Sequence, residues 1–218
     1  MSVNTPEQRR PRYYNEFAGS SRGRLEAISD GIFAVGMTLL VLGLAVPAVT
    51  AVHTESDLVR ELRNLLPSIV TYFMSFLTLG IFWVGQQTQL SKAEHANRAY
   101  TWIHLAFLLS VTFVPFSTKL LASFDWSRLA LILYWLNIAV MGIALLAALE
   151  YGLRTHVFPE DQRATIGQLF RRRVLGAQAL YFVAMLLCFI DPHISIGAFV
   201  AIQLNFAIAP PIPFLRSI

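Results

Sequence analysis

Charged residues and cysteines are scarce in this sequence of 218 residues. Only 14% of the side chains are charged, whereas a soluble domain carries about 25%, so the composition argues against a soluble protein. The single cysteine, Cys188, excludes an intrachain disulfide and any metal site built from several cysteines. Hydrophobic residues make up 56% of the chain, and the mean hydropathy is +0.56. This composition predicts an all-α, polytopic membrane protein with one membrane domain.

Catalytic and metal-binding motifs are also missing from the sequence. It contains no HExxH motif, no glycine-rich phosphate loop and no nucleophile next to a base. His104 is the one histidine inside a predicted membrane span, and a metal site needs three or four donors. We therefore expect no enzymatic activity, no cofactor and no resident metal, and a membrane-embedded enzyme is the weakest alternative.

Six apolar runs follow a polar N-terminal segment, residues 1–26. About twenty residues in a helix cover the roughly 30 Å hydrocarbon core of a bilayer. Residues 27–216 are therefore predicted to form a six-helix transmembrane domain, with an amphipathic interfacial segment at 58–67 and a kink permitted by Pro115. The predicted spans are residues 27–46, 66–86, 102–121, 129–149, 174–190 and 194–209.

Basic residues are distributed unevenly between the two ends of these spans. Of the 17 lysines and arginines, 13 fall on the side of the chain termini, and the opposite side has Arg60, Arg63, Lys119 and Arg128. The positive-inside rule then predicts that both termini are cytoplasmic, in a plasma membrane or bacterial inner membrane. Topology and contact with anionic lipid head groups account for the basic excess, so we expect membrane lipids and no nucleic acid as partners.

The first span carries an ionisable group near its start, Asp30, next to Ser29. A carboxylate that faces lipid costs on the order of 3 kcal/mol, so Asp30 should face protein or water and mark a functional site. The alternative is that Ser29 and Asp30 cap the helix and complement its dipole.

Helical periodicity separates Asp30 from an apolar stripe on the same span. At about 100° per residue, Val35, Thr38, Leu39 and Leu42 share one stripe, and Asp30 points roughly 140° away from Val35. Several copies with this stripe turned toward a common axis would form a narrow hydrophobic constriction with a ring of threonine hydroxyls, which gates by dewetting. The alternative is that the stripe packs against neighbouring helices.

The first span and two later segments resemble a known family. Arg24, Ser29 and Asp30 lie in RLEAISDGIFAVGMTLLVL, which resembles the first-helix signature of the transmembrane protein 175 family, the lysosomal and bacterial potassium channels. Trp83 in FWVGQQ and Pro115 in FVPFS continue this resemblance.

Two positions depart from the family pattern, and a third continues the resemblance. Ile28 replaces the usual phenylalanine of the first signature. Gln86 stands where the family commonly has histidine, so a proton sensitivity assigned to that histidine does not carry over. His104 lies where a polar residue, often asparagine, is expected.

The resemblance implies a homotetramer in which four first helices line a pore for potassium and other monovalent cations. It places the constriction on Val35, Thr38 and Leu42, and the absence of a carbonyl cage predicts modest selectivity for K⁺ over Na⁺, with a contribution from the Thr38 hydroxyl. The rival from another class is a secondary transporter that uses Asp30 and His104 for coupling. The resemblance also implies a polar network that holds the pore helix to the second and third helices, formed by Arg24, Ser29, Asp30, Trp83, Gln86 and His104.

Overall fold

The computed structural model describes residues 21–208, and every regular element within that range is a helix, which confirms the all-α prediction. Most of the predicted N-terminal segment and the proline-rich residues 210–213 lie outside the described residues. The elements are α2 (Arg22–Val41), η1 (Val49–Ala51), α3 (Glu55–Asn64), α4 (Leu66–Ser91), α5 (Arg98–Thr112), α6 (Val114–Ser123), α7 (Arg128–Arg154), α8 (Arg163–Leu186), η2 (Leu187–Phe189) and α9 (Pro192–Ile208).

Local sequence signals explain where several helices begin. Ser21, Asn97 and Ser127 precede α2, α5 and α7, and each side chain accepts a hydrogen bond from a backbone N–H of the first turn. Pro67 and Pro115 lie in the first turns of α4 and α6, where the missing N–H has no helical partner to lose. The interruption between α5 and α6 at Phe113 therefore lies just before Pro115, where the sequence permits a kink.

The number of helices long and apolar enough to cross a membrane differs from the predicted six. Within the described residues, four segments satisfy both length and composition: Leu66–Ser91, Arg98–Ser123, Arg128–Arg154 and Arg163–Phe189. The last helix, α9, is shorter, with 17 residues. The N-terminal half of the first helix, α2, carries charged residues. This helix ends at Val41 instead of Val46, so the long apolar run of the sequence is not one continuous helix.

Two predicted boundaries are wrong for physical reasons. After α2, the chain turns at Leu42, where the N–H groups of Gly43 and Leu44 bond back to carbonyls three residues earlier. Apolarity alone does not show where the backbone leaves the helix. The triple arginine 171–173, predicted in a loop, lies inside α8 because this helix already begins at Arg163 and buries Ile166.

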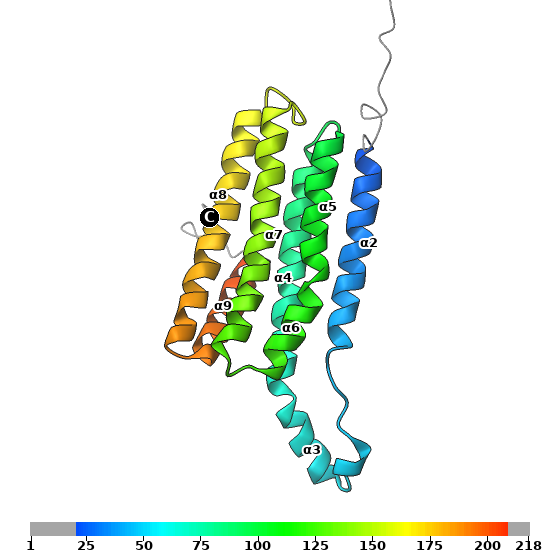
Figure 1. The fold of residues 1–218 in the computed structure, drawn as a ribbon, viewed down its shortest axis with the longest axis vertical. Helices are drawn as coiled ribbons and strands as arrows, with labels where there is room; N and C mark the ends of the chain where they lie inside the picture. Colours follow the sequence, from blue (N-terminus) through cyan, green and yellow to red (C-terminus); the bar gives the residue numbers. More distant parts are fainter. Residues whose placement is uncertain (1–20, 209–218) are drawn as a thin grey trace, which may run out of the picture.

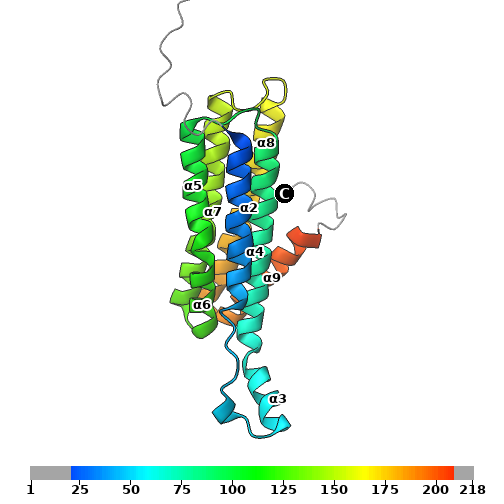
Figure 2. The same ribbon diagram turned by 90° about the vertical axis from the view of Figure 1, so that its right-hand side faces the viewer.

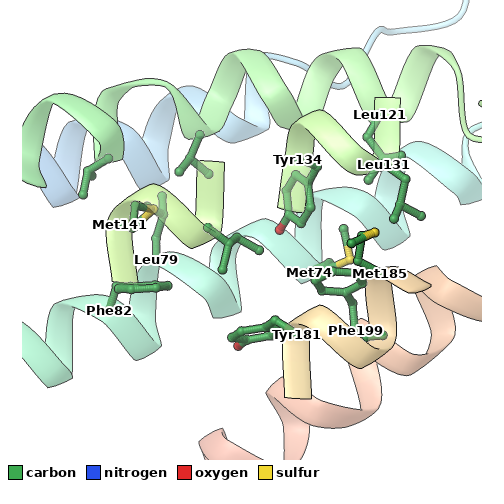
Figure 3. Close-up of a cluster of buried hydrophobic side chains, with 14 of the residues drawn as sticks. Met74, Leu79, Phe82, Leu121, Leu131, Tyr134, Met141, Tyr181, Met185 and Phe199 are labelled. Carbon is green, nitrogen blue, oxygen red and sulfur yellow. The ribbon is translucent and has the colours of Figure 1, made fainter. Parts of the chain in front are cut away.

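The helices lie side by side in a bundle with α2 at one edge and α8 and α9 at the other (Figure 1). Helix α2 packs against α4, α5 and α6. A large core of apolar side chains fills the middle of the bundle, with aromatic and methionine residues such as Tyr134, Tyr181 and Met74 at its centre (Figure 3). A second core, which includes Leu25, Leu90 and Leu149, lies at the end of the bundle where α2 begins.

The short helix α3 projects beyond the bundle at the opposite end from the start of α2 (Figures 1 and 2). None of its residues is buried, and Leu58, Val59 and Leu62 are exposed. Its start is fixed by a capping box, in which Thr54 accepts from the Asp57 N–H and the Asp57 carboxylate accepts from the Thr54 N–H. Hydrogen bonds from Thr54 and His53 hold the pKa of Asp57 below its usual value.

Candidate functional site

Helix α2 has one face covered by the bundle and one face that the described part of the chain leaves open. The covered residues recur at helical spacing, and Gly36 among them lies so close to Leu79 that an added Cβ would be 3.6 Å from it. These covered residues are Leu25, Ser29, Phe33, Gly36 and Leu40.

The four residues predicted to form the constriction all lie on the open face. Val35 is 57% exposed, Leu39 45% and Leu42 75%, and Thr38 is also exposed. Leu42 immediately follows the last helical residue, so it stands at the end of α2 and not inside a longer span. The Thr38 hydroxyl donates to the Val35 carbonyl at 2.9 Å, which leaves the oxygen lone pairs open for another contact.

Asp30 lies beside α4 and accepts two hydrogen bonds from it. The Trp83 indole N–H and the Gln87 amide both donate to its Oδ1 atom, each at 2.8 Å. Bonds of this kind compensate a carboxylate for the loss of water, which matters most in an apolar environment. Gln87 was not among the predicted network residues, although it follows Trp83 by four residues and so shares its helix face.

Ser29 makes a second link between α2 and α4, inside the bundle. Its hydroxyl donates to the Leu25 carbonyl at 2.7 Å and accepts from the Gln86 amide at 2.7 Å. Ser29 and Gln86 are both buried. Adjacent residues of α2 thus bond to two neighbouring positions of α4, one pair buried and one pair at the surface.

Arg24 and His104, the other two predicted members of the polar network, are not bonded to it. The Arg24 side chain is exposed and makes no hydrogen bond or ion pair with another described residue. Arg22 links the two helices instead: it donates to Glu26 of its own helix at 2.8 Å and to the Ala93 carbonyl, just beyond the end of α4, at 2.9 Å. His104 is buried on α5, and its Nδ1 atom lies 3.1 Å from the Tyr100 carbonyl.

The charged residues of the described range do not gather into a metal site. No group of three or more histidine, cysteine or acidic side chains is placed to bind an ion within residues 21–208. The polar groups that join α2 to α4 at Ser29 and Asp30 are a hydroxyl, two amides, an indole and a carboxylate, which suit hydrogen bonding between helices.

A scan against models of protein families matches residues 24–115 to the endosomal/lysosomal potassium channel TMEM175. A protein named potassium channel from Chamaesiphon minutus is 32% identical over 200 residues, covering 87% of this chain and 95% of its own. The chain belongs to the TMEM175 family. This is a family of ion channels and not of enzymes, and the matched residues run from the start of α2 to the start of α6.

Other relatives and a solved structure agree with the TMEM175 assignment. A protein named potassium channel from Streptomyces collinus is 31% identical, covering 81% of this chain and 86% of its own. Human TMEM175, named an endosomal/lysosomal proton channel, is 25% identical, and the match spans 36% of its length. The crystal structure of a lysosomal potassium-selective channel TMEM175 homolog from Chamaesiphon minutus superimposes with a TM-score of 0.74 at 29% identity, covering 88% of this chain and 98% of the other. The chain is accordingly a multi-pass membrane protein of the TMEM175 fold.

Proposed function

We propose that this TMEM175 chain is a potassium-permeable cation channel in which four copies line a central pore with the open face of α2. The observation that carries the proposal is the division of α2 into a covered face and an open apolar face that holds one hydroxyl. Relatives that are more than 30% identical are named potassium channels, which supports potassium as the permeant ion.

The open face has the chemistry of a narrow hydrophobic gate. Val35, Leu39 and Leu42 would present only apolar atoms to the pore, and rings of this kind restrict ions by expelling water. Thr38 adds an oxygen at the same surface, and its lone pairs would face a partly dehydrated cation. Without a cage of carbonyls, such a pore has modest selectivity for K⁺ over Na⁺.

The polar contacts on the other side of α2 would hold the pore helix in place. Asp30 is bonded to Trp83 and Gln87, and Ser29 is bonded to Gln86, so two links fix the rotation of α2 against α4. Rotation decides which residues face the axis, because neighbouring positions on a helix point about 100° apart. These residues have a supporting role and do not need to touch the ion.

Six crossings of a bacterial inner membrane with cytoplasmic termini fit the arrangement if α2 and α9 also cross. A helix of 20 residues such as α2 is about 30 Å long, which equals the hydrocarbon thickness. Basic residues such as Arg22, Lys92 and Arg154 lie at the end of the bundle where α2 begins, and the positive-inside rule makes this end cytoplasmic.

Recording from purified protein in a planar bilayer tests the proposal. We expect unitary currents far above about 10³ ions per second, the upper range of ordinary enzymatic turnover, and a carrier that couples transport to Asp30 could not reach them. Val35→Ala and Leu42→Ala should each give a several-fold larger unitary conductance because they widen and hydrate the constriction. The matched control is Ile143→Ala on the exposed face of α7, which should leave conductance unchanged. Unchanged conductance in both α2 variants would refute the pore assignment.

A further inference from the structure

Four buried polar side chains of α4 and α5 have atoms without hydrogen-bond partners. Gln86, Gln89, Tyr100 and His104 are each 0% exposed. Among the described residues, no partner is present for Gln86 Oε1, for either amide atom of Gln89, for the Tyr100 hydroxyl or for His104 Nε2. Folded proteins rarely leave so many buried donors and acceptors unpaired in one place, so something should complete these bonds.

The four side chains lie at about the same height along the bundle axis, and this layer of Gln86, Gln89, Tyr100 and His104 is called the polar level. Helices α4 and α5 are not a closely packed pair; α2 packs against both of them, and it lies between them in Figure 2. On one side of this level, the ring centroids of Phe82 and Phe107 are 6.2 Å apart. On the other side, the Gln89 amide is a close neighbour of the Tyr100 hydroxyl, although without hydrogen-bond geometry.

The antiparallel direction of α4 and α5 then places Gln86 opposite His104. Along α4, Gln86 lies between Phe82 and Gln89, and along α5, His104 lies between Phe107 and Tyr100. Beyond this level, Leu25 and Leu90 belong to the apolar core at the end of the bundle, and Phe82 and Phe107 belong to the central core. Apolar clusters therefore close the polar level at both ends.

Existing hydrogen bonds decide which atoms of this level donate and which accept. The Tyr100 carbonyl near His104 Nδ1 can only accept, so Nδ1 carries the proton and Nε2 is left with a lone pair. The Ser29 hydroxyl donates to Leu25, so the amide nitrogen of Gln86 must donate to Ser29, and its oxygen faces the interior. The level thus has unpaired acceptors on His104, Gln86 and Gln89, and unpaired donors on Gln89 and Tyr100.

We propose that this level is a binding site for internal water, which joins His104 of α5 to Gln86 of α4. The missing ligand must donate to some atoms and accept from others, and it must be small and uncharged. The Asp30 carboxylate is turned to Trp83 and Gln87, so it does not balance a cation here. Water meets each requirement and commonly forms about three bonds to buried polar groups. Through Gln86 and Ser29 the water also supports α2, independently of whether α2 lines a pore.

A density map of the full-length protein in lipid nanodiscs, at a resolution that shows ordered water, tests the site directly. We expect an isolated peak within about 2.6–3.2 Å of both His104 Nε2 and Gln86 Oε1. A map in which no peak is present, and in which the two glutamines and His104 bond to one another directly, would overturn the proposal.

A double-mutant cycle on thermal unfolding gives a second test. Gln89→Met and His104→Phe should each lower the midpoint of thermal unfolding, because each removes a hydrogen bond of the water and leaves its other partners less well bonded. The double variant should lower the midpoint by less than the sum of the two single changes. The matched control is Gln203→Met, which removes a buried glutamine that bonds Thr78 directly at 2.7 Å. Thr78 lies about 12 Å along α4 from Gln86, so this variant should add independently to His104→Phe. Simple additivity of Gln89→Met and His104→Phe would contradict a shared water site. If His104→Phe does not fold, His104→Gln takes its place in the cycle.

Discussion

The two faces of α2 are built from similar apolar residues but differ in what covers them. The inward face carries Phe33 and Leu40, which are 1% and 3% exposed, and the outward face carries Val35 and Leu39, which are 57% and 45% exposed. Hydropathy therefore does not tell the two faces apart. The polar residues separate them better, because Ser29 is bonded to α4 on the inward side and the Thr38 hydroxyl bonds only within its own helix.

The difference means that α2 is tightly packed on one side and open on the other. Phe33 packs against Phe107 with ring centroids 6.0 Å apart, and Gly36 allows Leu79 to approach the backbone. Dense packing of this kind resists changes of volume. The outward face meets no such partner among residues 21–208, so it can border water and ions or a second copy.

The largest expected effect comes from a cavity on the inward face. Phe33→Ala should lower the free energy of unfolding by about 3–5 kcal/mol, the usual loss for a buried phenylalanine. Leu39→Ala on the outward face should change it far less. Thermal unfolding in detergent measures both variants, and equal losses would mean that both faces are buried in the assembly.

A smaller effect, on assembly, is expected from Asp30 at the edge between the two faces. Asp30→Ala removes the acceptor of the Trp83 and Gln87 hydrogen bonds and frees α2 to rotate. Size-exclusion chromatography should show less of the proposed tetramer and more of a smaller species. Asp161→Ala, at an exposed position in the turn between α7 and α8, is the control and should elute as the wild type does. An unchanged elution profile of Asp30→Ala would show that Asp30 has no part in assembly.

The variant with the smallest structural change, Thr38→Val, is expected to alter only the selectivity between K⁺ and Na⁺. Thr38→Val keeps the shape of the side chain and removes the hydroxyl, so we expect unchanged folding and a lower permeability ratio of K⁺ over Na⁺. Reversal potentials with potassium on one side and sodium on the other give this ratio. Thr38→Ser keeps the hydroxyl and should stay close to the wild type. Equal ratios in the valine and serine variants would show that the hydroxyl has no part in selectivity.

Sequence reasoning predicted the helical class, and the resemblance to the family placed Asp30 and Trp83 in one polar network, in which the structure has a hydrogen bond between them. It did not predict the hydrogen bonds of Gln87 to Asp30 and of Arg22 to the Ala93 carbonyl. A glutamine or arginine near a helix end has several partners within reach, and only the packing of α2 against α4 selects one. It placed the end of the first helix too late, because the residues after Val41 are as apolar as those before it.

His104 shows a further limit of sequence reasoning. The resemblance to the family implied a link to the α2 network, but its Nδ1 atom is bonded to the Tyr100 carbonyl of its own helix. The Nε2 atom faces a buried level shared with Gln89 and Tyr100. The pairing of α4 with α5 across that level depends on the register of two antiparallel helices, which periodicity within one helix does not give.

The most direct measurement places a thiol on the open face of α2 and asks whether permeating ions reach it. In a Cys188→Ala background, which removes the buried native thiol, Thr38→Cys channels are exposed to silver ions, which resemble potassium in size and bind thiolates. We predict an irreversible loss of current, and no loss for Phe33→Cys on the covered face. If silver leaves the Thr38→Cys current intact, or blocks both variants equally, the open face of α2 does not line the pore.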